Sequence, residues 1–224
     1  MTTPDIDTER PYTHDMVIVH RMFRRESGLL PRMVRAVPEG DTARARAIAD
    51  HYEFYAAGLH SHHTGEDELV WPLLLARVDL EAETVLRMEA QHHRVDETMQ
   101  RVAALLPAWR SSASAAAREQ LAVALQEHHA ALIEHLDDEE QYVLRLIAEH
   151  LTVAEWQAVG ERGMKHVQED RKHALIALGS ILEEADAQET AFFMSHLPAP
   201  ARVLWHLVGK RQYRRRTQLL RAGL

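Results

Sequence analysis

The chain has 224 residues, of which 46% are hydrophobic and 27% charged, so it can form an apolar core and remain soluble. Its formal net charge of −8 argues against general nucleic-acid binding, and the absence of cysteine excludes disulfides, thiolate ligands and iron–sulfur clusters. The chain also contains 16 histidines, too many to be a compositional accident.

Residues 1–13 are polar and contain Pro4 and Pro11, which predicts a mobile N-terminal arm. This segment does not resemble a signal peptide, and no apolar run in the chain approaches the roughly 20 residues that a membrane-spanning helix requires. We therefore expect a cytoplasmic protein without a membrane span. Only 9 glycines and 8 prolines interrupt the chain, so its helices are expected to be long.

Four segments carry apolar residues at alternating steps of three and four, the pattern of a helix with one buried seam. They cover residues 14–36, 42–75, 81–109 and 116–150. The expected seams are Met16, His20, Phe23, Ser27, Leu30 and Val34; Ile48, Tyr52, Tyr55, Leu59, His62, Glu66, Leu69 and Leu73; Met88, His92, Val95, Met99, Val102 and Leu106; and Leu121, Leu125, His128, Leu132, His135, Glu139, Tyr142 and Leu146. Four helices with one period predict an all-α fold, an antiparallel four-helix bundle spanning residues 14–150.

Three local features refine this bundle. Pro38–Asp41 and Ser111–Ala115 are expected to be loops between helices. Pro72 lies inside the second seam, where it should kink the helix or begin its end, because proline removes a backbone donor.

Residues 151–224 form shorter segments, which we expect to be a helical appendage packed against the bundle. Thr152–Glu155 and Asp186–Glu189 have the spacing of capping boxes, and a helix is predicted over about residues 168–184. The end of the chain, residues 210–216, is a basic tail. It is expected to be solvated, and the alternative is a weak contact with an anionic membrane surface or a partner.

Histidine and glutamate interrupt the apolar seams at a spacing that suggests metal ligation. His62 and Glu66, and likewise His135 and Glu139, are four residues apart and so share one face of a helix. A lone carboxylate in a dry seam is costly unless a cation binds it together with neutral imidazoles. The predicted ligand set is His20, His62, Glu66, His92, His135 and Glu139, with the two glutamates bridging two metal ions. Nitrogen and oxygen ligands in a bundle favour two irons, with manganese or zinc as alternatives.

Several neighbours leave the ligand set open. The residues that could join it are His63, Asp96, Glu140, Tyr52 and Tyr55, although both tyrosines are better explained by core packing. His60, His93 and His128 are expected behind the ligands or at the surface. The acidic residues Asp67, Glu68, Asp137 and Asp138 are expected on a solvated face.

The order of these residues resembles the hemerythrin-like, or HHE cation-binding, family. The sequence from His62 to Pro72 is very like the second-helix signature of that family, and His135–Glu140 resembles its fourth-helix signature; the match covers about residues 14–150. The resemblance implies a non-haem di-iron centre that reacts with dioxygen, peroxide or related small oxidants.

Two positions depart from the oxygen-carrying hemerythrins. Those proteins place a second histidine where this chain has Asp96, and an aspartate where it has Glu140. A more carboxylate-rich site favours redox chemistry, peroxide handling or sensing over reversible oxygen carriage. A catalase-like or other oxidoreductase activity is one possibility, with no residue assigned as catalytic. The alternatives are an oxygen- or iron-responsive sensor module and an iron store without turnover.

Overall fold

The computed structural model describes residues 10–168 and 171–224, and the side chains of these residues outside 164–172. Residues 1–9 of the predicted N-terminal arm lie outside the described residues. Every regular element of the described residues is helical, which confirms the all-α prediction. The elements are α1 (His14–Arg35), α2 (Thr42–Leu69), α3 (Trp71–Leu75), α4 (Ala82–Ser112), α5 (Ala115–Asp138), η1 (Glu139–Val143), α6 (Leu144–His150), α7 (Val153–Gln168), α8 (Arg171–Leu182), α9 (Ala187–Ser195), α10 (Ala199–Leu204), η2 (Trp205–Gly209) and α11 (Lys210–Leu220). The elements η1 and η2 are single π-helical turns.

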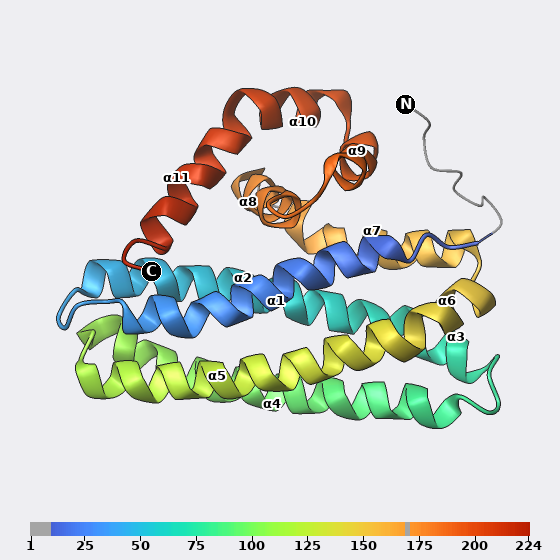
Figure 1. The fold of residues 1–224 in the computed structure, drawn as a ribbon, viewed down its shortest axis with the longest axis horizontal. Helices are drawn as coiled ribbons and strands as arrows, with labels where there is room; N and C mark the ends of the chain where they lie inside the picture. The colour runs from blue at the N-terminus through green and yellow to red at the C-terminus, as the bar shows by residue number, and fades with distance from the viewer. Residues whose placement is uncertain (1–9, 169–170) are drawn as a thin grey trace.

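Four long helices, α1, α2, α4 and α5, lie side by side, and the chain reverses direction from each to the next (Figure 1). Contacts join α1 to α2, α2 to α4, α4 to α5 and α5 to α1, so the four helices surround a common interior. The seams predicted for α1 and α4 are buried along their whole length. Within the described residues no helix is both long enough and apolar enough to traverse a bilayer.

The second predicted helix is interrupted where α2 ends and α3 begins, at Val70. Pro72 cannot donate the next backbone hydrogen bond, so the helix restarts with its buried side turned. Leu69 and Leu73, predicted on the seam, are only partly buried, whereas Val70 and Leu74 are fully buried. The prediction of a break near the proline is correct, and the seam predicted beyond Glu66 is wrong by one position.

The fourth predicted helix contains the π-helical turn η1, which adds a residue to one turn of the helix. The buried seam therefore runs from Glu139 to Val143, and Tyr142, predicted on the seam, is 41% exposed. The loop predicted at Ser111–Ala115 is also shorter than expected, because α4 continues to Ser112. Ala113 then reverses the chain in the left-handed region, at φ 46°.

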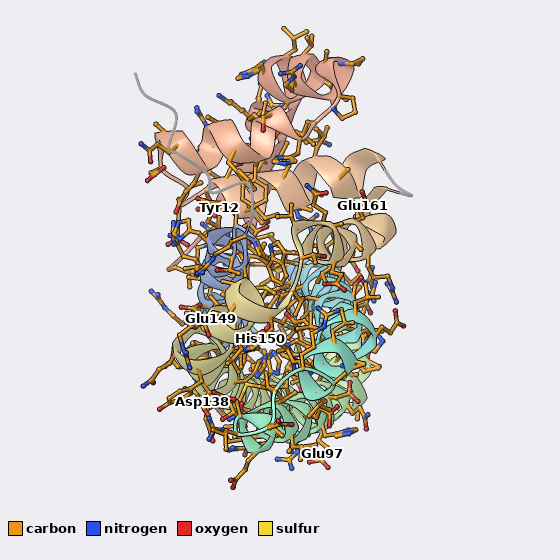
Figure 2. The ribbon with its side chains drawn as sticks, turned by 90° about the vertical axis from the view of Figure 1, so that its right-hand side faces the viewer. Tyr12, Glu97, Asp138, Glu149, His150 and Glu161 are labelled. Carbon is orange, nitrogen blue, oxygen red and sulfur yellow. The ribbon has the colours of Figure 1, made fainter. Side chains whose placement is uncertain are left out.

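The C-terminal helices α7 to α11 cover only the side of the molecule formed by α1 and α2. Figure 2, which looks along the long helices, shows the later of these helices above α1 and α2, whereas α7, marked by Glu161, lies on α2 at the height of α1. Contacts join α7 and α11 to α2 and α8 to α1. Both predicted capping boxes are present, with Thr152 and Asp186 each capping the backbone of a glutamate three residues later. The helix predicted over residues 168–184 corresponds to α8.

A buried ion-pair network fastens the end of the chain to the long helices. Glu26 of α1 is 3% exposed and accepts hydrogen bonds from His51 of α2 at 2.9 Å, from Arg25 at 2.8 Å and from Arg221 at 3.1 Å. Arg221 also pairs with Glu183, which follows α8. One carboxylate thus joins α1, α2 and the residue that follows α11.

Candidate metal centre

The interior of the four long helices contains two apolar clusters, separated by a polar layer. One cluster includes Phe23, Leu59, Val95 and Leu132, and the other includes Met16, Val70, Met88 and Val143. Every long helix passes from one cluster to the other, and the residues at the crossing are His20 on α1, His62, His63 and Glu66 on α2, His92 on α4, and His135 and Glu139 on α5 and η1.

These seven side chains form two groups, and in each group the ligand atoms all lie within 4.8 Å of one another. The first group is His63, Glu66, His92 and His135, and all four residues are buried. The second group is His20, His62, Glu66 and Glu139. All six residues predicted as ligands are therefore brought together, and Glu66 is common to both groups.

Glu66 lies between the two groups, with one oxygen towards each. Its Oε1 is 3.3 Å from His62 Nε2, and its Oε2 is 3.5 Å from His92 Nε2. Glu139 has a similar intermediate place, because its Oε2 is 3.4 Å from His20 Nε2 and 3.5 Å from His135 Nε2. Both carboxylates can therefore reach two positions at once, as bridging ligands do.

Most of the polar atoms that face the interior lack hydrogen-bond partners, although His20 Nε2 and His62 Nε2 lie 3.2 Å from each other. Both oxygens of Glu66 and of Glu139 are buried without one, and so is Nε2 of His63, His92 and His135. Leaving so many buried polar atoms unsatisfied is costly, and proteins rarely do so without a ligand. The unsatisfied atoms are nitrogens and oxygens aimed at two shared points, which fits a pair of divalent cations.

The pKa shifts of the histidines and glutamates in the polar layer also favour cation binding. Burial and then the neighbouring Glu139 raise the pKa of Glu66 well above its ordinary value, and burial also raises the pKa of Glu139. Burial and neighbouring histidines lower the pKa of His62, His63 and His135 well below the ordinary value. The imidazoles are therefore neutral and able to bind a cation, while the carboxylates need positive charge beside them to ionise.

Two further carboxylates lie behind the imidazoles. His92 Nδ1 donates a hydrogen bond to Asp67 at 2.7 Å, and His20 Nδ1 donates one to Glu140 at 3.0 Å. Against the effect of burial, which raises them, these hydrogen bonds hold the pKa of Asp67 and of Glu140 below the ordinary value. Each contact fixes the ring so that Nε2 faces the interior. Asp67 is thus not simply on a solvated face, and Glu140 supports a histidine from outside the two groups.

The other candidate residues stay out of both groups. Asp96 accepts a hydrogen bond from Gln100 on the surface of α4, and His60 and His93 are exposed. Tyr52 donates to the backbone oxygen of Met99, which accords with core packing. Tyr55 and His128 form a hydrogen bond with each other in the core, where Tyr55 Oη and His128 Nε2 are 2.8 Å apart. Asp137 and Asp138 bind surface arginines.

His63 is the residue that the predicted ligand set omits. It lies one position after His62, off the seam, and its ring stacks on that of His92 with centroids 4.1 Å apart. The sequence feature that indicates His63 as a ligand is the pair of consecutive histidines, His62 and His63. Successive helical residues point about 100° apart, so the second histidine of the doublet faces α4 while the first faces α1. It provides an imidazole for the first group, where Asp96 provides none.

Comparison with known proteins gives one match. No curated protein and no solved structure matches the chain. A sequence model of the hemerythrin HHE cation binding domain matches residues 13–147, which is more than half of the 224 residues.

Proposed function

The chain belongs to the hemerythrin HHE cation-binding family, and from that premise we propose that it is a di-iron protein that reacts with dioxygen or peroxide. In this proposal α1, α2, α4 and α5 form an antiparallel four-helix bundle of the hemerythrin type. Residues 14–150 are its metal-binding domain, and residues 151–224 are a helical appendage.

The observation that supports two ions is the sharing of Glu66 by two groups of ligand atoms. We assign His20 and His62 to one ion and His63, His92 and His135 to the other. Glu66 and Glu139 would be shared by the two ions, because each lies close to a histidine of both groups. One site therefore has three histidines and the other has two.

The choice of iron rests on the donor set and on charge. Imidazole and carboxylate donors without sulfur suit iron, and zinc sites most often use four ligands around a single ion. Two divalent ions bring four positive charges. The carboxylates of Glu66 and Glu139, together with those of Asp67 and Glu140 behind the imidazoles, bring four negative charges, so the centre is close to neutral as a whole.

The arrangement supports chemistry at the site with two histidines. Iron held there by His20, His62 and the two glutamates would supply the redox chemistry for a small oxidant. The chain's own part is to hold the donors in place and keep the surroundings dry. His62 is the most exposed of the seven candidate ligands, with 12% of its side chain accessible, so a small molecule has its shortest approach on that side. The carboxylate-rich ligand set favours reduction of peroxide or dioxygen over reversible oxygen carriage.

The test is the metal content per chain, with the visible spectrum recorded in the reduced protein under argon and again after addition of air or peroxide. We expect close to two irons per chain, and ligand-to-metal absorption that develops on oxidation. Peroxide should be consumed over repeated additions with release of dioxygen, because without an added reductant a second peroxide must supply the electrons that the first one takes up. One zinc per chain with a silent spectrum would contradict the proposal, and an oxygen-dependent band that disappears again under argon would indicate a carrier instead.

One contact favours a second candidate function, a sensor whose output is the C-terminal helices. Arg162 of α7 lies against Gly65 of α2, beside the ligand Glu66, and donates to Glu68 at 2.8 Å. A shift of α2 on oxidation would therefore reach α7 directly. Limited proteolysis of the reduced and the oxidised iron-loaded protein tests this. A change in cleavage within α7 to α11 without peroxide turnover would favour the sensor over the oxidoreductase.

A further inference from the structure

The last helical segment of the chain, α10–η2–α11, has an inner side that is packed and an outer side that is not. Trp205, Gly209 and Tyr213, at steps of four, are buried. Gly179 of α8 lies directly under the Tyr213 ring, and Gly209 lies against Leu175 of α8. A side chain at Gly179 would collide with the Tyr213 ring, so this close packing fixes which side of the segment faces outward.

The outer side carries several exposed aliphatic residues. Val203, Leu204, Leu207 and Val208 are all exposed, and Leu207 is 74% exposed. They lie within two successive turns, and α10 is at the edge of the molecule farthest from α4 and α5 (Figure 1). The other large apolar side chains exposed on the described part of residues 10–198 are Leu80, Leu86, Val123 and Tyr142, which are scattered over separate elements. The cluster on α10 and η2 is therefore the apolar patch of this surface.

A cationic surface continues directly from this patch along α11. Val203, Leu207, Arg211 and Arg214 follow one another at steps of four, four and three, and so share one face of the segment. On this segment, the side chains of five exposed cations have no acidic partner among the described residues: Arg202, Lys210, Arg211, Arg214 and Arg215. On the long helices, the exposed arginines Arg87, Arg94 and Arg101 are paired with acidic residues, whereas Arg32 and Arg46 are not.

The charge of the whole chain is divided in the same way. Residues 190–224 contain seven lysines and arginines and no acidic residue, whereas residues 1–189 contain 19 basic and 34 acidic residues. An acidic protein with one strongly basic end has the charge asymmetry of a chain that binds a polyanion or an anionic surface.

We propose that the outer side of α10–η2–α11 docks on the surface of an anionic lipid bilayer. A bilayer interface accepts both parts of the face at once, because aliphatic side chains enter the headgroup boundary while arginines contact lipid phosphates. Nucleic acid would match the cations but leaves the four aliphatic residues in water. A second copy of the chain offers acidic residues but no apolar patch of its own on the long helices.

The experiment is co-sedimentation of the full-length protein with vesicles of phosphatidylcholine alone and with vesicles that also contain phosphatidylglycerol. We expect binding only to the anionic vesicles, and weaker binding as salt is raised. Replacing Arg211 and Arg214 together by glutamine should weaken binding about 25-fold, at about fivefold for each charge. Leu207→Ser should weaken it by up to about tenfold, since its side chain no longer enters the interface.

Matched control variants separate the surface from general charge and apolarity. The pair Arg94→Gln and Arg101→Gln removes the same two charges from the long helices, and Leu80→Ser removes an apolar side chain that is 93% exposed. Neither should change vesicle binding. Equal binding to both kinds of vesicle, no binding to either, or equal loss in the control variants would overturn the proposal. So would binding of duplex DNA or self-association that depends on Arg211 and Arg214 while vesicles are ignored.

Discussion

Glu66 offers the sharpest test of the metal centre, because the structure predicts that one substitution has opposite effects with and without metal. Glu66→Met replaces a carboxylate that is 0% exposed, and whose two oxygens lack hydrogen-bond partners, with an apolar side chain of similar volume. The substitution leaves the surrounding packing intact but removes the donor shared by both ligand groups.

The magnitudes follow from burial and from linkage. In the metal-free protein, removing a buried polar group without partners should stabilise the fold by about 1–3 kcal/mol. In the iron-loaded protein, ligands that bind only the folded state stabilise it by about 4 kcal/mol when present at a thousandfold over Kd. Loss of one ion therefore lowers Tm by about 10 °C for a chain of this length, and loss of both by about twice as much.

The assay is thermal unfolding of wild type and Glu66→Met, each with and without iron, together with metal content per chain. We expect a lower Tm for the variant only in the iron-loaded pair, and a higher Tm in the metal-free pair. Asp138→Ala, at a carboxylate that binds Arg87 and Gln91 rather than the centre, is the control and should keep both metals. Two metals retained in Glu66→Met, or equal destabilisation with and without iron, would refute the bridging role.

Three further predictions test the surroundings of the centre. His63→Leu should leave about one tightly bound iron per chain, because the site with three histidines loses one while the other site is unchanged; metal analysis after gel filtration measures this. Asp67→Asn should weaken metal binding about 10–100-fold without removing a ligand, as measured by competition with a chelator, whereas Glu68→Gln should not. Burial raises the pKa of Glu26, but hydrogen bonds from His51 and Arg25 lower it to about 2 overall. Its contribution of about 3 kcal/mol is present above pH 4.5 and lost as the pH falls towards 2, so wild type and Glu26→Gln should unfold at similar denaturant concentrations at low pH and differ at pH 7.

The helices could be predicted because their sequence period is regular over many turns. In α1 and α4 the steps of three and four run without interruption, and each seam residue predicted there is buried. The capping boxes at Thr152 and Asp186 could also be predicted, since both partners lie within four residues of sequence.

The buried seams change phase at two points, and a periodic pattern does not show where a helix changes its winding. Pro72 marks the first change in the sequence, but not how far the next helix turns. The π-helical turn at Glu139–Val143 has no marker residue, and an uninterrupted α-helix would place Tyr142 rather than Val143 on the seam, although Leu146, predicted beyond this turn, is buried. Val143, and not Tyr142, lies on the seam because it packs in the second apolar cluster.

The supporting residues of the centre were hidden for a different reason. Asp67 and Glu140 each follow a buried glutamate directly. The sequence predicts Asp67 on a solvated face and Glu140 as a possible further ligand, and only the neighbouring helix supplies the imidazole that each one binds. The Glu26 network is hidden in the same way, because Arg221 is 195 residues away in sequence. Contacts between distant segments are not recorded in the periodicity of either one.

The centre is built twice on the same local plan, and the departure from that plan bears on its reactivity. In Glu66–Asp67 and in Glu139–Glu140 the first carboxylate faces the interior and the second fixes an imidazole from a neighbouring helix. Each pair also follows a histidine four residues earlier, so two equivalent halves would give two equivalent ions. His63 breaks this equivalence by adding a third histidine to one group only. If two ions are bound as proposed, the one held by His20 and His62 would have fewer histidine ligands, and it would lie on the side where His62 is partly accessible.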